Sequence, residues 1–405
     1  MLDVNKIRED FPILRTSVYG RELVYLDNAA TAQKPQRVID CVNRLHRELN
    51  GNIHRGVHYM SEECTSLYEA ARQTMCDKIG AADAREIVFT SGATASVNLV
   101  AYSFGEMSVG EGDNVIVSEM EHHSNIVPWQ LLCKRKGAEL RVLPFDDDGR
   151  LAIEKLTSLI DSRTRIVAVT QCSNVLGTCP DIKAVTDAAH SFGVPVLVDG
   201  CQGAVHMPTD VQALGCDFYA FSGHKLYGPT GTGVLYGRAE LLEKMPPFMG
   251  GGDMVDRVSF SGTAFAAPPL KFEAGTSNYI GAIGMAEAVH YLDSIDLAAA
   301  SEHENTLREY AERLLSQIDG LRIYGSQTDK GPIVSFGVEG VHNYDMGMIL
   351  DKLGIAVRTG MHCAEPVMHH YGVGGMCRAS FAIYNTREEV EALADGVRRA
   401  VKMLR

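Results

Sequence analysis

In Phe218-Tyr-Ala-Phe-Ser-Gly-His-Lys-Leu-Tyr-Gly-Pro-Thr-Gly-Thr-Gly-Val-Leu-Tyr236, two apolar runs enclose a polar turn. The first run ends at Phe221 and the second covers residues 233–236, a pattern that predicts two strands. Lys225 lies in the turn between them, where its amine could form a Schiff base with a carbonyl cofactor. Most lysines in loops are ordinary surface residues, so assigning Lys225 to a Schiff base needs a second signal.

That signal is an acidic residue at the end of the preceding strand. Val194-Pro-Val-Leu-Val-Asp-Gly-Cys-Gln202 is an apolar run that ends in Asp199. A carboxylate at such a place can keep a pyridine nitrogen protonated, which makes the ring of pyridoxal phosphate an electron sink. Alone, Asp199 would be read as a turn or cap residue. Together, Lys225 and Asp199 indicate a pyridoxal phosphate site.

The length, composition, net charge and cysteine count limit the class of protein. The 405 residues are enough for two domains, and 45% hydrophobic with 22% charged residues is ordinary for a globular protein. A net charge of −13 argues against nucleic acid or an anionic membrane as the partner. Ten scattered cysteines without a Cys-x-x-Cys pair predict reduced thiols and no metal site. The start has no signal-peptide core and no run is long enough to span a membrane, so we expect a cytoplasmic protein.

Strands alternate with helices through the first two thirds of the chain. The pattern predicts strands at 114–118, 141–145, 165–170 and 194–198, separated by helices at 125–136, 152–160 and 182–192. Such alternation indicates an α/β fold with parallel strands, whose ligands collect at the carboxyl ends of the strands. One pocket should therefore gather the residues just past predicted strands: Thr94, His122, Asn174, Asp199 and Lys225.

The last third has a different pattern. After 250–275, which shows little helical periodicity, we expect helices at 279–293, 301–318 and 387–404 and strands at 333–338 and 378–384. These residues predict a smaller α+β domain. The expected organisation is an N-terminal arm at 1–20 that packs with the small domain, a large domain at 21–290 with a dimer-contact segment at 250–275, and a small domain at 291–405.

Four stretches together carry a resemblance to a known family. They are the Lys225 and Asp199 pair, Glu121-His-His-Ser-Asn125, Glu273-Ala-Gly-Thr-Ser-Asn278 and Arg358-Thr-Gly-Met-His-Cys-Ala-Glu-Pro366. With them, the whole chain resembles the pyridoxal phosphate-dependent cysteine desulfurases, in the SufS-like group II branch of the class V aminotransferase relatives. The resemblance implies fold type I: a mostly parallel seven-stranded sheet flanked by helices, and a smaller C-terminal domain that carries Cys363 and Arg378.

The resemblance also implies roles for single residues. Lys225 would hold the cofactor, Asp199 its pyridine nitrogen, Gln202 its phenolic oxygen, and His122 would stack on its ring. Its other ligands would be Thr94, Asn174, Ser222 and His224, with Thr276 reaching in from the second subunit of a homodimer. Asn174, Arg358 and Arg378 would bind the substrate, and Lys225, His122 and Cys363 would be catalytic.

The implied reaction converts L-cysteine to L-alanine and leaves a persulfide on Cys363, which supplies sulfur for iron–sulfur cluster assembly. A SufE-type or SufU-type protein would accept the sulfur, and His342 resembles a position that contacts a zinc-bearing SufU partner, although an ordinary surface histidine fits equally well. The alternatives are a selenocysteine lyase, an aminotransferase in which Cys363 is incidental, and a scaffold protein without catalysis.

The chain departs from the family pattern at four places. Met361 stands where a second histidine is common, Ala95-Ser96 replaces a glutamate-containing pair, and Ser277 replaces a proline. Glu365 stands where a neutral residue is usual, and a carboxylate close to Cys363 would disfavour the thiolate that must attack the substrate.

Overall fold

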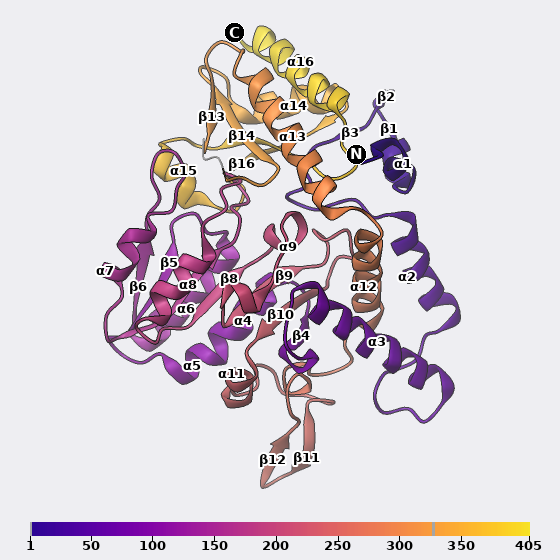
Figure 1. The fold of residues 1–405 in the computed structure, drawn as a ribbon, viewed down its shortest axis with the longest axis vertical. Coiled ribbons are helices and arrows are strands. Elements are labelled where there is room, and N and C mark those ends of the chain that lie inside the picture. Colours follow the sequence, from indigo (N-terminus) through magenta and orange to yellow (C-terminus); the bar gives the residue numbers. More distant parts are fainter. Residues whose placement is uncertain (1, 326–328) are drawn as a thin grey trace.

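A seven-stranded sheet forms the centre of the protein (Figure 1). The computed structural model describes residues 2–325 and 329–405. The strand order is β4 (Ile87–Thr90), β10 (Gly233–Gly237), β9 (Phe218–Ser222), β8 (Val196–Asp199), β7 (Thr164–Thr170), β5 (Asn114–Ser118), β6 (Glu139–Leu143). Only β10 runs antiparallel to its neighbours. The predicted α/β fold with a mostly parallel sheet is confirmed.

The central strands are apolar on both faces because helices cover both faces. In β8 and β9 every residue is buried, as is typical of a parallel sheet inside an α/β protein. Alternate residues enter two separate hydrophobic clusters: Val196 and Val198 belong to one, and Leu197 belongs to the other. The helices of this part are α2 (Gln36–Glu48), α3 (Tyr59–Lys78), α4 (Ala93–Tyr102), α5 (Phe104–Ser108), α6 (Val127–Lys136), α7 (Leu156–Leu159), α8 (Ile182–His190), α9 (Gly203–His206), α10 (Val211–Leu214), α11 (Ala239–Lys244) and α12 (Tyr279–Asp293).

A second, antiparallel sheet lies near the C-terminus (Figure 1). Its order is β13 (Leu321–Tyr324), β14 (Ile333–Val338), β17 (Met376–Ser380), β16 (Arg358–Gly360). The accompanying helices are α13 (Leu297–Leu315), α14 (Asn343–Lys352), α15 (Glu365–Tyr371) and α16 (Arg387–Leu404). Residues of this sheet and of α13, α14 and α16 share a hydrophobic cluster of their own. This cluster supports, as a proposal, the domain boundary near residue 290.

The N-terminal segment contacts the C-terminal part. Arg8 of α1 (Val4–Glu9) donates to the Tyr384 carbonyl and forms an ion pair with Glu389 at 2.9 Å. Further on, β3 (Val24–Tyr25) pairs in parallel with β15 (Ile355–Ala356). These contacts support the proposed packing of an N-terminal arm on the small domain.

Several predicted element bounds are wrong. The strand expected at 141–145 is β6, which begins at Glu139, and the helix expected at 152–160 is the shorter α7. Two further differences have a clear cause. The strand expected at 378–384 is β17, which ends at Ser380, because Asn385 accepts the Ala382 amide proton and turns the chain out of the sheet. The helix expected from residue 301 begins at Leu297, because Asp296 caps it by accepting from the Ala299 amide.

A hairpin of β11 (Val255–Ser259) and β12 (Gly262–Phe265) projects from the large sheet's side of the protein (Figure 1). Its strands are exposed along their length apart from Val255, and Phe260 at its tip is fully exposed. Within the described residues, no helix is long and apolar enough to cross a membrane.

Candidate functional site

One cavity of about 150 Å³ lies where the carboxyl ends of the central strands face the antiparallel sheet. Ten of the twelve residues named from the sequence line it: Thr94, His122, Asn174, Asp199, Gln202, Ser222, His224, Lys225, Arg358 and Arg378. The cavity gathers these side chains because β5, β7, β8 and β9 run parallel and end at one edge. The expectation of a single pocket at the strand ends therefore agrees with the geometry.

Lys225 sits in a tight turn after β9. The Gly223 amide donates to the Thr232 carbonyl and the Gly228 amide donates to the Gly223 carbonyl, which closes the turn. The His224 carbonyl accepts from the Ala32 amide and so ties the turn to the N-terminal segment. Lys225 is half-buried, and no ion pair holds its amine among the described residues. The amine is free to react in the cavity.

Asp199 is the last residue of β8 and is buried. Its Oδ1 accepts from the Cys201 amide at 3.0 Å, and its second oxygen is available to a cationic ring nitrogen. Behind it lies Glu121, fully buried, which accepts from the Thr170 amide at 2.7 Å. Burial raises the pKa of Glu121 to about 8, so this carboxyl is protonated at neutral pH and adds no negative charge behind Asp199.

Two histidines of the cavity are neutral. Burial and the nearby Lys225 lower the pKa of both His122 and His224 to about 4. The Ser124 amide donates to His122 Nδ1 at 3.1 Å, which assigns the ring proton to Nε2. A neutral imidazole in a fixed orientation can stack on an aromatic ring without adding charge.

The other end of the cavity suits a phosphate. The helix α4 begins at Ala93, so its first amides and its positive dipole end point toward Thr94 and Ser222. Ser222 Oγ accepts from the Ala93 amide at 2.9 Å. Gly92 has φ of +149°, and a Cβ there would come within 3.3 Å of Ser222 Oγ. A side chain at position 92 would therefore crowd Ser222. The helix N-terminus with Thr94 and Ser222 at one end, and Asp199 and Lys225 at the other, fit pyridoxal phosphate.

Two arginines of the antiparallel sheet line the cavity and lie opposite each other on neighbouring strands. Arg358 of β16 is opposite Arg378 of β17 in the register. Arg378 is buried and donates to the Asn174 carbonyl and to Asp27 Oδ1, both at 2.8 Å. Its Nε is buried without a partner. A buried, unpaired donor beside a second cation is suited to the carboxylate of an amino acid.

Cys363 lies beside this pair, and Arg358 Nη2 is 3.5 Å from its sulfur. His362 and Cys363 both have positive φ, 53° and 56°, which is rare for residues with a Cβ. Three contacts hold this backbone: the His123 amide donates to the Cys363 carbonyl at 2.7 Å, Asn174 donates to the His362 carbonyl at 2.9 Å, and the Glu365 amide donates to His123 at 3.1 Å. The strained turn directs the sulfur toward Arg358.

Thr276 is not brought to this cavity. It is exposed in the loop before α12. Met361 is 46% exposed, and the Glu365 carboxylate is half-exposed and 3.9 Å from His369. The sequence reasoning missed Asp27, which holds Arg378, and the lining residues Thr170, Cys172 and Cys201. Thr170 could have been found, because it ends a predicted strand.

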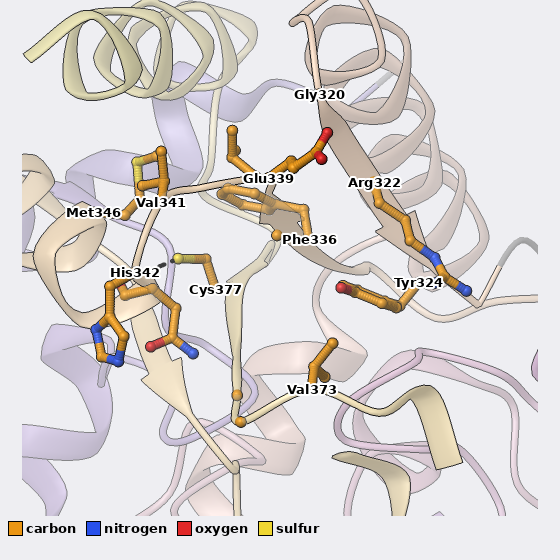
Figure 2. A pocket seen from close by; sticks show the side chains of 15 residues that line it. Gly320, Arg322, Tyr324, Phe336, Glu339, Val341, His342, Met346, Val373 and Cys377 are labelled. Carbon is orange, nitrogen blue, oxygen red and sulfur yellow. Dashed lines mark hydrogen bonds between the residues drawn. The ribbon is translucent and has the colours of Figure 1, made fainter. Parts of the chain in front are cut away.

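A larger cavity of about 500 Å³ lies on the antiparallel sheet, away from Lys225. Figure 2 shows Phe336, Tyr324 and Cys377 around it, with His342 and Arg322 on opposite sides. It offers no cluster of metal-ligating side chains among the residues described, and its wall is partly apolar.

Comparisons with known proteins identify the family of the chain. Residues 24–393 match the model of the family "Aminotransferase class-V". A cysteine desulfurase of Klebsiella pneumoniae (strain 342) is 51% identical over 402 residues, which cover 99% of each chain. The crystal structure of the cysteine desulfurase CsdA from Escherichia coli is 43% identical, with a TM-score of 0.94 over 100% of both chains. A cysteine desulfurase of Thermococcus onnurineus, solved in an apo form, is 37% identical with a TM-score of 0.94, over 100% of this chain and 99% of that one.

Proposed function

Because this chain belongs to the class-V aminotransferase family, and within it to the cysteine desulfurases, we propose that it moves the sulfur of L-cysteine onto the Cys363 thiol and releases L-alanine. One observation supports this assignment above the others. Arg358, 3.5 Å from the Cys363 sulfur, lines the same cavity as Lys225 and Asp199. An aminotransferase reaction does not require a thiol beside the substrate, so Cys363 would have no chemical role in it.

The residues that would hold pyridoxal phosphate are those of the cavity described above. Lys225 would carry it, Asp199 would meet its pyridine nitrogen, Gln202 would reach its phenolic oxygen, and His122 would cover its ring. Thr94, Ser222 and His224 would bind its phosphate, with Asn174 near the substrate side. When bound, the group supplies an electron sink for the substrate's Cα electrons.

The chain's own residues do the remaining work. Arg378 and Asn174 orient the substrate carboxylate, with Arg358 adding positive charge. The Lys225 amine takes the Cα proton. The Cys363 thiolate attacks the substrate sulfur, so that an S–S bond forms on the enzyme as the substrate's C–S bond breaks.

The test measures alanine and sulfide released from L-cysteine with a reductant present. Wild type should produce both, whereas Cys363→Ala and Lys225→Ala should lose activity with cysteine. Cys41→Ala, which removes a half-buried thiol of α2, is the matched control and should stay active. Full activity of Cys363→Ala with cysteine would overturn the assignment. Activity of Cys363→Ala with selenocysteine alone would favour the alternative, a selenocysteine lyase.

We also propose a homodimer in which Thr276 completes the partner's site. Thr276 is exposed and remote from its own cavity, and the projecting hairpin presents Val258, Phe260 and Phe265 to solvent. Exposed apolar side chains in one group indicate an interface. Mixing subunits tests this proposal, because a dimer of Lys225→Ala with Thr276→Glu contains one intact site only if Thr276 acts across the interface. Random pairing should then restore about a quarter of wild-type activity, and no recovery would place Thr276 in its own subunit's site.

The sulfur would pass to an acceptor protein of SufE or SufU type for iron–sulfur cluster assembly. The supporting features are the partly exposed Cys363 and the large cavity beside His342 (Figure 2). His342→Ala should weaken transfer to such an acceptor and leave cysteine turnover with a small reductant unchanged. Ten free cysteines support the proposal of a reducing, cytoplasmic location.

A further inference from the structure

Two cysteines outside the proposed mechanism lie next to each other at the substrate end of the cavity. Cys172 is buried and lines the cavity, and Cys179 lies beyond the short loop that carries Asn174. The Ser173 amide donates to the Thr178 carbonyl at 2.8 Å and the Gly177 amide donates to the Ser173 carbonyl at 3.0 Å, so the chain folds back on itself and brings Cys172 and Cys179 together. A turn closed in this way can bring two cysteine side chains within the reach of a disulfide.

The sulfur atoms are also close. Both thiols donate a hydrogen bond to the Gly177 carbonyl oxygen, Cys172 at 3.3 Å and Cys179 at 3.4 Å. The two thiols also contact each other. This contact raises the pKa of Cys172 and lowers that of Cys179. Cys179 therefore loses its proton more readily and is the stronger candidate for the attacking thiolate, whereas Cys172 stays protonated.

Cys179 is accessible from the other side of the loop. It is partly exposed and lines a second cavity of about 390 Å³ together with His206, Arg308 and Lys330. The same cavity also holds Glu304, Glu309 and Asp329, and the basic groups are ion-paired with glutamates, so the neighbouring thiol is the main feature that distinguishes Cys179. A partly exposed thiol next to a second thiol has the features of a redox-sensitive cysteine pair.

We propose that Cys172 and Cys179 form a redox modification site, which a hydroperoxide converts from two thiols into a disulfide. The Cys179 thiolate attacks the peroxide oxygen, the O–O bond breaks, and hydroxide or alkoxide leaves. The Cys172 thiol then attacks the resulting sulfenic sulfur, an S–S bond forms, and water leaves. The two sulfur atoms lose two electrons in total, and the peroxide takes them.

The disulfide should change the substrate end of the cavity. A disulfide has no S–H group, so both hydrogen bonds from the thiols to the Gly177 carbonyl are lost, and the two sulfur atoms must approach to about 2 Å. Asn174 lies within the loop that the bond closes, and it holds both the His362 carbonyl and Arg378. We expect oxidation to weaken L-cysteine binding by roughly tenfold, the equivalent of one hydrogen bond to a charged group. This second statement depends on the proposed function.

The first test is chemical and needs no turnover. The Cys363→Ser holoenzyme is treated with hydrogen peroxide, alkylated and mapped by mass spectrometry, with Cys179→Ser in the same background as the control. The expected result is a disulfide between Cys172 and Cys179 that dithiothreitol reverses, and no disulfide in the control. If both thiols remain open to alkylation, or if either joins another cysteine, the proposed pair is wrong.

The second test measures L-cysteine affinity by cofactor absorbance in the same two proteins, before and after oxidation. Binding should weaken only where the disulfide forms. An affinity change of less than about twofold would overturn the coupling to the substrate end. If the reduced protein gives no response to L-cysteine, the proposed function fails, whereas the mass measurement still decides whether the cysteine pair exists.

Discussion

Replacing Arg378 by lysine should weaken the use of L-cysteine while keeping the positive charge. The Arg378 guanidinium makes two fixed contacts at 2.8 Å, to the Asn174 carbonyl and to Asp27, and has its Nε free for a substrate. A lysine has a single nitrogen and cannot keep both contacts and still reach a carboxylate.

The loss should equal one or two hydrogen bonds to charged groups, about 3 kcal/mol, or about a hundredfold in kcat/KM. Most of it should appear in KM, because the substrate carboxylate is bound before and during the reaction alike. The assay is alanine release against L-cysteine concentration, with cofactor content checked by absorbance. Arg398→Lys on the exposed side of α16 is the matched control.

A kcat/KM within about threefold of wild type would refute the reasoning, because a point charge would then serve as well as the planar fork. A large fall in kcat at unchanged KM would refute it differently, by showing that Arg378 acts only in the transition state.

Three further predictions follow from buried and half-buried charges. Glu365→Gln should speed persulfide formation on Cys363 by about two- to threefold at pH 7, since it removes a negative charge two residues from the attacking sulfur and a half-exposed charge acts only modestly; single-turnover alanine formation measures it. Glu273→Gln should lower the free energy of unfolding by about 3 to 5 kcal/mol in urea, because it removes the buried anion of Arg72 and leaves only the half-exposed Glu69 as its partner. His362→Gln should make stability depend less on pH between about 6.5 and 4, by up to about 1.4 kcal/mol per pH unit, measured by urea denaturation across that range.

The sign of the last prediction comes from burial. Burial and Arg378 lower the pKa of His362 to about 3, below that of an unfolded histidine, so the unfolded chain binds the proton first. The stability that neutral His362 contributes is full above about pH 6.5 and is lost as the pH falls toward 3. A steeper loss of stability in the variant would contradict this.

For Glu365→Gln, an unchanged pH–rate profile would contradict the prediction. For Glu273→Gln, the contradicting result is a loss of unfolding free energy no larger than that of Asp395→Asn, which removes one partner of an exposed ion pair.

Much of the fold could be predicted from the sequence because the central strands are buried on both faces. Their apolar runs have clear ends, and residues such as Asp199 and Lys225 follow those ends directly. The end of β17 could not be predicted, because it depends on the side chain of Asn385, whose contact with the Ala382 amide forms only in the folded chain.

The sequence indicates the residues of the cavity that carry a reactive or charged group of their own, and it misses those that act by holding a neighbour. Asp27 lies far from Arg378 in the sequence, and the bridge between Asp27 and Ser380 at the end of β17 brings the two together only in the folded chain. In the same way, no local pattern shows that Cys172 faces Cys179, since that follows from a hydrogen bond across the loop. The role of Thr276 stays a prediction, because it concerns a second subunit.

The two consecutive left-handed residues His362 and Cys363 determine how far the sulfur can travel. Their backbone is hydrogen-bonded to His123 and Asn174, so the thiol is carried by a short, anchored turn and not by a long swinging arm. A sulfur atom on such a turn remains where it was loaded. If an acceptor protein takes this sulfur, as proposed above, its own reactive group has to come to Cys363, and the surface around this anchored turn then limits which acceptors can reach it.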